Sequence, residues 1–390
     1  MAEKTDKSQL PETLITSDLI RSSDKALAFL SNTILAHDFR EQHNDIAYYF
    51  KAPLAFIDAD LKEDALQALV HARTFTKHGL TESNCRDPVY RTEYPAYCQA
   101  WLATAASELG LLDEASSELQ HVDKYVDTIQ RAATVRQPFV ANGSADTNMT
   151  DIFATAVVAN VYHHCGDMSK TKALAHKIIE CVRKQPQSDS KFFLRMSGTG
   201  ELITDIAEDL ADRGFYVIDS ERPDQLYFML GFPLIILARL FKLTGDEEYL
   251  NGARLLLAFL KLCDRECIVM STDIEKIKSE MKNEKLHYLH SSIWAHKVAR
   301  GLALLASAKS CPDSVREDCM RMATTIGRHF MARQLPNGCF SVDGSELATM
   351  RNVDQTSELA CWLRGIGTDL AEAAHHHLQS CGMSTDVTPP

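Results

Sequence analysis

The chain has 390 residues, of which 45% are hydrophobic and 24% are charged, which excludes wholesale disorder and a fibrous repeat. Its formal net charge of −12 makes it a poor general binder of nucleic acid and a poor ligand for an anionic membrane surface. We therefore expect neither as a partner, and we expect a small molecule instead.

The first residues are polar and charged and lack the apolar core of a secretory signal. The longest apolar run, 226–238, is shorter than the roughly 20 residues that span a bilayer, so it predicts a buried helix and no membrane span. Eleven cysteines without a CxxC pair indicate reduced thiols and a cytoplasmic location. The sequons at Asn142 and Asn148 are interpreted as chance matches. The sequence does not specify an oligomeric state.

Helical periodicity starts near Leu14 and continues in paired segments to about Ala374. We interpret each pair as a hairpin of two antiparallel helices. The first helices of the six hairpins are predicted to begin near Asp45, Glu93, Asn148, Asp224, His290 and Asp354. The second helices are predicted to begin near Lys62, Asp113, Ser169, Asp246, Asp313 and, wrapping round the chain ends, Leu14.

The connections inside the hairpins carry helix stop and start signals. Gly110, Gly166 and Gly245 stand where a helix end needs a left-handed residue, and an acidic residue follows that can cap the next helix. The first helices are apolar nearly all round, whereas the second helices show one polar stripe, so the first set is predicted to be inner and the second outer. Six of each predict an all-α (α/α)₆ toroid. The unequal spacing of the hairpins argues against a solenoid.

One section departs from the helical pattern. Residues 191–204, with a Gly198-Thr-Gly200 turn, predict two short strands, and residues 215–218 predict a third. We expect a small β-hairpin insertion, about 191–220, on one rim of a single domain formed by residues 1–380. Residues 273–285 are highly charged and predict a solvated helix or loop, and residues 381–390 predict a flexible tail.

Gln334, Gly338 and Phe340 match the pattern Q-x3-G-x-W/F. This pattern resembles the QW motif of triterpene cyclases, in which it ends an outer helix and braces the next inner one. The whole chain is similar in pattern to the α/α-toroid superfamily, which includes terpenoid cyclases, protein prenyltransferase β-subunits, sugar 2-epimerases and six-hairpin glycosidases. The resemblance implies the ring of helices and does not identify one family within the superfamily.

The catalytic signatures of those enzymes are missing from the sequence. The DxDD motif of class II cyclases is matched only by Asp58-Ala-Asp60, which Leu61 follows, and neither a DDxxD motif nor a recognisable zinc triad occurs. A G-x-S-x-G elbow, a Walker A motif and a G-x-G-x-x-G motif are also absent. We therefore expect no metal and no cofactor.

Aromatic residues on the predicted inner helices suggest a lined cavity. Tryptophan is large, and buried tryptophan needs close packing or a ligand face. Alternatively, these residues only fill the interior of the ring. The candidate substrate-binding residues are Trp101, Trp294, Trp362, Tyr97, Tyr227 and Asp224.

The N-terminal ends of six inner helices meet at one mouth, where their dipoles favour anionic groups. Asp354 and Glu358 are four residues apart and so share a helix face, and a carboxyl group buried against an aromatic wall can act as an acid. Histidines at an inner-helix start could act as acid or base. Helix capping and a solvated rim are the alternatives. The candidate catalytic residues are Glu358, Asp354, His290, His296, Asp45 and Tyr49.

These features lead to three hypotheses. The first is a cofactor-independent isomerase, cyclase or lyase that acts by acid/base chemistry on a small, largely apolar metabolite, terpenoid-like or polyketide-like, of specialised metabolism. The second is a carbohydrate-active toroid, either a sugar epimerase or a glycosidase. The third is a non-catalytic helical scaffold, which predicts a packed interior without a cavity. The substrate and the stereochemistry are not specified by the sequence.

Overall fold

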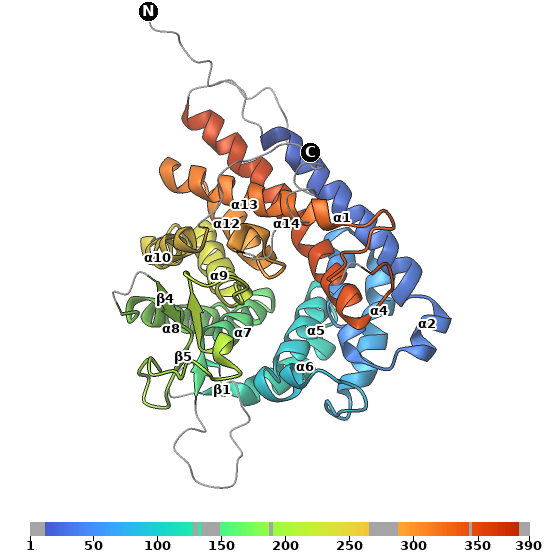
Figure 1. The fold of residues 1–390 in the computed structure, drawn as a ribbon. Coiled ribbons are helices and arrows are strands. Elements are labelled where there is room, and N and C mark those ends of the chain that lie inside the picture. The colour runs from blue at the N-terminus through green and yellow to red at the C-terminus, as the bar shows by residue number, and fades with distance from the viewer. Residues whose placement is uncertain are drawn as a thin grey trace, which may run out of the picture.

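Six helical hairpins form the molecule (Figure 1). The computed structural model describes residues 12–127, 132–133, 149–186, 190–264, 288–342 and 345–381. The inner helices are α3 (Ala52–Asp58), α5 (Tyr97–Glu108), α7 (Ile152–His164), α9 (Phe228–Thr244), α12 (His296–Ser307) and α14 (Met350–Ser380). The outer helices are α4 (Lys62–Thr76), α6 (Leu112–Val122), α8 (Met168–Arg183), α10 (Glu247–Cys263), α13 (Asp313–Arg333) and α1 (Glu12–Ile34).

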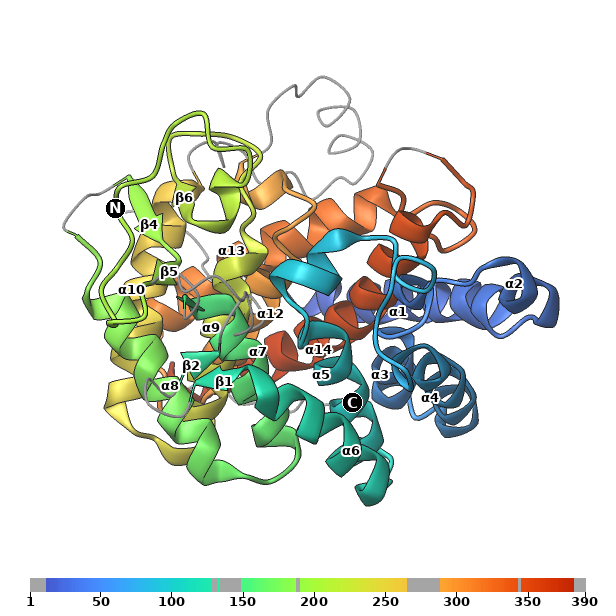
Figure 2. The ribbon, with the colours of Figure 1, turned by 90° about the horizontal axis from the view of Figure 1, so that it is seen from below.

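Each inner helix contacts the next, and α14 contacts α3, so the inner ring closes. The last hairpin joins the two ends of the chain, because α1 packs along α14 (Figures 1 and 2). α5, α7 and α9 are apolar on nearly all sides because they are covered on nearly all sides, and in α9 the whole run from Met229 to Ala238 is buried. The predicted (α/α)₆ toroid is confirmed.

Most inner helices begin later than predicted. A short 3₁₀ helix, Ile46–Tyr48, precedes α3, and a π-helical turn, Val89–Glu93, precedes α5. The expected starts at Glu93, Asp224 and His290 are each a few residues early. Glu93 ends the π-helical turn, Asp224 lies in a left-handed turn, and His290 lies in a short 3₁₀ helix, Leu289–Ser291. In contrast, α14 begins at Met350 with Thr349 as its cap, so Asp354 lies inside the helix.

The predicted glycine stops are confirmed. Gly110, Gly166 and Gly245 have φ values of +74°, +80° and +69°, in the left-handed region where glycine avoids a steric penalty. The acidic residues after Gly166 and Gly245 cap as expected, since the carboxylates of Asp167 and Asp246 accept hydrogen bonds from Lys170 N and Glu248 N. Asp113, after Gly110, does not cap α6 but lies inside its first turn. The connections are therefore short and the helices antiparallel.

The strands form on one rim, but they do not make one simple hairpin. β4 (Lys191–Phe193) pairs antiparallel with β6 (Val217–Asp219), which confirms the third strand. β5 (Arg195–Met196) pairs with β3 (Thr150–Asp151), directly before α7. Across the Gly198–Gly200 turn only a single bridge, Met196 to Leu202, is made. β1 (Val126–Asp127) pairs with β2 (Ala132–Ala133). The insertion therefore contacts the N-terminal end of an inner helix.

Two glycines let α9 and α12 approach each other closely. A Cβ atom on Gly231 would lie 2.4 Å from Lys297 Cβ, and one on Gly301 would lie 2.8 Å from Leu234 Cγ. Real side chains do not approach that closely, so both positions require glycine at this separation of the helices. The contact fixes the place of Lys297 at the start of α12.

The QW-like segment braces the ring as the resemblance implies. The amide of Gln334, at the end of α13, accepts from Ser22 Oγ at 2.7 Å and donates to the Ser22 carbonyl at 2.7 Å and the Gly338 carbonyl at 3.0 Å. Phe340 is buried, and its backbone N–H donates to Thr356 Oγ1 on α14 at 2.9 Å. One segment thus ties α13 to both helices of the closing hairpin.

Several predictions lie outside the described residues: Asn142 and Asn148, the charged segment 273–285 and most of the tail 381–390. Across the described ranges, every helix is too short or too polar to cross a membrane. The described cysteines carry free thiols, and all but Cys165 and Cys381 are buried.

Candidate active site

A cavity of about 330 Å³ lies at the N-terminal ends of the inner helices. Every inner helix contributes to it at its start: Lys51 precedes α3, Tyr97 opens α5, and Phe153, Phe228 and Lys297 lie in the first turn of α7, α9 and α12. Further lining residues are Asp87, Val89, Tyr90, Tyr94, Phe215, Leu226, Ile293, Trp294, Val342, Arg351, Asp354, Gln355 and Glu358. Most of the wall is aromatic or aliphatic, so the cavity suits a largely apolar molecule.

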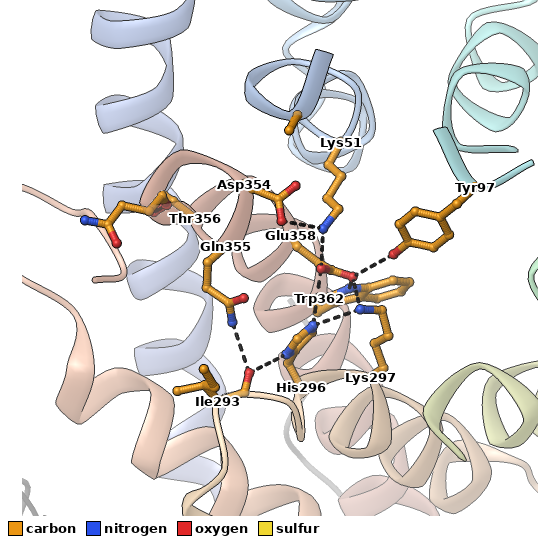
Figure 3. A network of polar contacts seen from close by, with 12 residues as sticks. Lys51, Tyr97, Ile293, His296, Lys297, Asp354, Gln355, Thr356, Glu358 and Trp362 are labelled. Carbon is orange, nitrogen blue, oxygen red and sulfur yellow. Dashed lines mark hydrogen bonds and ion pairs between the residues drawn. The ribbon is translucent and has the colours of Figure 1, made fainter. Parts of the chain in front are cut away.

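Glu358 is the centre of a buried polar network at this cavity (Figure 3). Its Oε2 accepts from Lys51 Nζ at 2.7 Å, and its Oε1 pairs with Lys297 Nζ. Trp362 Nε1 and Tyr97 OH also donate to Oε1, at 3.2 and 3.5 Å. Glu358 is 2% exposed and both lysine side chains are 4% exposed. Burial would raise the pKa of Glu358, but the two ammonium groups hold it well below its usual range. Glu358 is thus a fixed anion.

Asp354 differs from Glu358 although it lies one turn away on the same helix. Its Oδ2 accepts from Lys51 Nζ at 2.8 Å, whereas its buried Oδ1 has no hydrogen-bond partner among the described residues. Burial raises the pKa of Asp354 to about 6, partly offset by the charge of Lys51. A cavity carboxyl group with one free oxygen and a pKa near neutrality can take up and release a proton.

His296 and Lys297 form the other side of the network. Burial lowers the pKa of His296 to about 4, so the ring is neutral. Its Nδ1 lies 3.1 Å from the Ile293 carbonyl oxygen, which can only accept, so we assign the proton to Nδ1. Nε2 then faces Lys297 Nζ at 3.2 Å. Burial, together with Lys51, lowers the pKa of Lys297 to about 8, although Glu358 opposes the shift.

The structure brings part of the predicted set together. Glu358, Asp354 and His296 meet in one network, and Tyr97 and Trp294 line the same cavity. Trp294 contacts Phe228 edge to face, with ring centroids 5.6 Å apart.

The structure places the other predicted catalytic residues elsewhere. Asp45 is fully buried and caps the 3₁₀ helix, accepting from Ala47 N and Arg86 N, so the alternative interpretation as a helix cap holds. Tyr49 donates its hydroxyl to the His43 carbonyl at 2.8 Å and stacks on Phe75. Both residues lie before α3, because α3 begins later than predicted, and neither lines the cavity.

The remaining candidates also lie outside the cavity. His290 Nδ1 lies 3.2 Å from the Asp264 carboxylate, at the end of α10. Tyr227 is completely buried just before α9 and lines neither this cavity nor the smaller, second cavity of the ring. Asp224 has a φ of +56° and belongs to the turn before α9. His290, Tyr227 and Asp224 all precede their helices, and none of the three lines the cavity.

Trp101 and Trp362 lie one layer deeper. They contact each other edge to face at 5.8 Å between centroids, and Phe232 contacts Trp362 at 5.9 Å. Beyond these rings lies the second cavity, of about 90 Å³, which shares no lining residue with the first and contains Asp58, His164, Arg239 and Arg300. The three rings therefore form a floor between the two spaces, which we call the aromatic floor.

Lys51 was not predicted as a site residue, and no chemistry was predicted for Lys297. Lys51 is the one charged residue in the apolar segment 46–57, whereas Lys297 shares the start of α12 with His296 and Arg300. That signal was available, because a lysine in such a segment must find a counterion when it is buried. Phe153, Phe228 and Tyr90 were missed because apolar and aromatic residues occur throughout the inner helices.

Comparison with solved structures supports the fold. The chain is similar to the GH76A α-1,6-mannanase of Salegentibacter sp. HEL1_6 (TM-score 0.56, 12% identity, 89% of this chain and 99% of the other). It is similar to a D-mannose isomerase (TM-score 0.57, 14% identity, 91% and 98%) and to an unsaturated glucuronyl hydrolase specific for heparin (TM-score 0.50, 10% identity, 94% and 98%). These are α/α toroids, and at such low identity the likeness shows the fold alone.

No protein-family model and no curated protein matches the sequence. The chain therefore has the α/α-toroid fold, and its reaction has to be argued from its own site.

Proposed function

We propose that the protein is a cytoplasmic, cofactor-independent isomerase, cyclase or lyase of specialised metabolism. Its substrate is a small, largely apolar metabolite of terpenoid or polyketide type, and the reaction is proton transfer in the cavity at the N-terminal ends of the inner helices. The observation that carries the proposal is Asp354: a partly buried carboxyl group, whose buried Oδ1 has no partner among the described residues, in a mainly aromatic cavity.

The cavity separates two tasks. Its aromatic wall holds the apolar body of the substrate, and Lys51 and Lys297 attract a polar group of the substrate. Asp354 then moves a proton at a carbon near that group, while Glu358 keeps the two lysines in place. A pKa of about 6 leaves Asp354 mostly ionised at neutral pH, so it can act as the base that starts the transfer.

The test detects proton transfer even when the product is not identified. The purified protein is incubated in D₂O with a panel of apolar ketones, aldehydes and acids, and mass spectrometry measures deuterium uptake at carbon. We expect uptake in at least one compound and a loss of at least about 100-fold in Asp354→Asn, since acid/base catalysis is typically worth that much.

Asp60→Asn is the matched control, because Asp60 is exposed and its left-handed φ of +59° suits asparagine. Uptake that survives in Asp354→Asn, or a panel without any uptake, would overturn the proposal.

A carbohydrate-active enzyme is the second candidate. Asp354 and Glu358 are carboxyl groups bridged by one ammonium group, and rings that could stack on a sugar lie beside them. However, Glu358 uses both oxygens in the network, which leaves one carboxyl group for a reaction that needs two. Thermal-shift screening with mono- and disaccharides separates the candidates: stabilisation by sugars alone would favour this one.

The scaffold hypothesis predicted a packed interior, and the cavity of about 330 Å³ contradicts that prediction.

A further inference from the structure

We propose that Lys297 is a nucleophile that forms an imine with a carbonyl group of the substrate. The inference rests on the proposed function and narrows it, because it assigns the polar group that faces the lysines to an aldehyde or a ketone. The assignment depends on the residues of this cavity and not on the likeness to other α/α toroids.

The position of Lys297 suits a nucleophile. Its side chain is 4% exposed and lines the cavity, and its Nζ lies 5.1 and 5.8 Å from the ring centres of Phe228 and Phe232. The close approach of α9 at Gly231 holds its backbone. A carbonyl group in the cavity would meet this amine beside apolar rings, where water competes poorly.

The charges around Lys297 favour a reactive amine. Two lysines, Lys51 and Lys297, share one carboxylate, Glu358, so one anion must compensate two cations. Lys51 has a second carboxylate, Asp354, which keeps its pKa above the usual value despite burial. Lys297 has no second carboxylate partner within the described residues and faces the neutral ring of His296. Desolvation and a neighbouring cation are two recognised ways of activating a lysine.

These effects give Lys297 a usable population of neutral amine. With a pKa of about 8, about one tenth of Lys297 is neutral at pH 7, against less than about one thousandth of an ordinary lysine.

The covalent step balances within the cavity. The neutral amine of Lys297 attacks the carbonyl carbon, so an N–C bond forms and the C=O π bond breaks. The oxygen takes a proton from the protonated form of Asp354, about one tenth of the population at pH 7, and the nitrogen returns one of its own protons to that carboxylate. The hydroxyl group then leaves as water with the Asp354 proton, which leaves a protonated imine and an ionised Asp354. No oxidant or reductant is needed.

The imine would explain why the site combines a lysine with a carboxyl group. A protonated imine withdraws electrons from the neighbouring carbon and makes its hydrogen acidic. The ionised Asp354, in the same cavity, is then the base that removes this hydrogen, and isomerisation or elimination follows.

The experiment traps the imine. The protein is incubated with 2-naphthaldehyde and sodium cyanoborohydride, which reduces an imine to a stable amine, and peptide mapping measures the labelling rate of each lysine. Lys62, which is 76% exposed, serves as the internal reference. We expect Lys297 to label at least about tenfold faster than Lys62 near pH 7, with a rate that rises through about pH 8.

Variants locate the reaction. Lys297→Arg keeps the charge opposite Glu358 and should lose the label, whereas Lys170→Arg, at an exposed position outside the cavity, should keep it. Formaldehyde is tested in parallel as a smaller aldehyde, so that failure of the naphthalene ring to enter the cavity cannot by itself explain a missing label. Labelling of Lys297 no faster than Lys62 with both probes would overturn the inference.

The two proposals fail in different ways. Deuterium uptake that depends on Asp354, without any label on Lys297, would overturn the imine and keep the proton transfer. A label on Lys297 without uptake in any compound would keep the reactive amine and overturn the proposed function.

Discussion

Four charged side chains are buried together at the site, and their charges balance. Lys51 and Lys297 face Asp354 and Glu358, and each close pair is hydrogen-bonded or in direct ionic contact. Burial of such a group without a partner would cost several kcal/mol. Apolar residues of similar size would fill the ring without this cost. The cluster therefore contributes specificity or chemistry rather than net stability.

The pH dependence of proton transfer follows from Asp354. Its ionised form is the base, so we expect deuterium uptake to rise as pH increases through about 6. Lys51 lowers that pKa from 2.8 Å away, so Lys51→Met should move the midpoint to higher pH. The rate of uptake measured across the pH range checks both statements.

Lys62→Met, at an exposed position, is the control and should leave the midpoint in place. A midpoint that stays at the same pH in Lys51→Met would show that Asp354 is not the titrating group.

For individual residues, the four-residue spacing of Asp354 and Glu358 was enough to predict that they share one face of a helix with Trp362. The difference between the two carboxyl groups was not predictable. It depends on Lys51, which is about 300 positions away in sequence and within 3 Å in space. Only the closed ring determines which carboxylate has a free oxygen.

Among the elements, the pair α9 and α12 controls the position of Lys297. Gly231 on α9 and Gly301 on α12 have no side chain. The backbones of the two helices therefore lie closer together than a Cβ atom at either position would allow. The position of Lys297 thus depends on a packing contact between two helices, and a change in that contact should alter the cavity.

Gly231→Ala tests this contact. The added Cβ would lie 2.4 Å from Lys297 Cβ, so α12 has to shift, and we expect the free energy of unfolding to fall by about 1–3 kcal/mol. Urea denaturation measures the loss, and labelling of Lys297 should slow in the same variant.

Gly252→Ala, on the outer helix α10, is the matched control, because the nearest atoms there belong to the side chains of Ile179 and Leu237. An equal loss of unfolding free energy in both variants would mean that the α9–α12 contact is no less tolerant of an added Cβ atom than the packing of α10.

The sequence predicted the elements well and their starts less well. Helix ends at Gly110, Gly166 and Gly245 follow from a local backbone requirement, and they were placed correctly. Helix starts were assigned to capping-type residues such as Glu93 and Asp224, but the chain first makes a π turn or a left-handed turn there. Glu93 pairs with Arg195 of β5, 102 positions further along the chain, and local sequence does not contain such a contact.

For the whole molecule, closure of the ring depends on the pairing of α1 with α14. The amide of Gln334 satisfies two backbone carbonyl groups and one hydroxyl group across this junction. The closing hairpin is the least local part of the fold, because its two helices come from opposite ends of the chain.

Gln334→Ala should weaken the junction. The carbonyl groups of Ser22 and Gly338 would lose their partner, so we expect the free energy of unfolding to fall by about 1–3 kcal/mol. Gln67→Ala, which removes an exposed contact with Arg40, should cost less than about 0.5 kcal/mol. Urea denaturation measures the free energy of unfolding of both variants. Equal losses of free energy in the two variants would contradict a bracing role for Gln334.

The closed ring itself was predictable from six hairpins and one QW-like segment. The cavity was only partly predictable, because periodicity indicates which helices are inner but not how far the interior is filled. Trp101 and Trp362 were expected on the wall of the cavity and instead lie beneath it.

That lower position of the tryptophans has a kinetic consequence. The aromatic floor lies between the two cavities, which share no lining residue. A molecule in the larger cavity therefore finds no passage through this floor into the smaller one. A product still in the larger cavity would keep the next substrate out, so we expect product to inhibit competitively, and departure can set the pace of turnover.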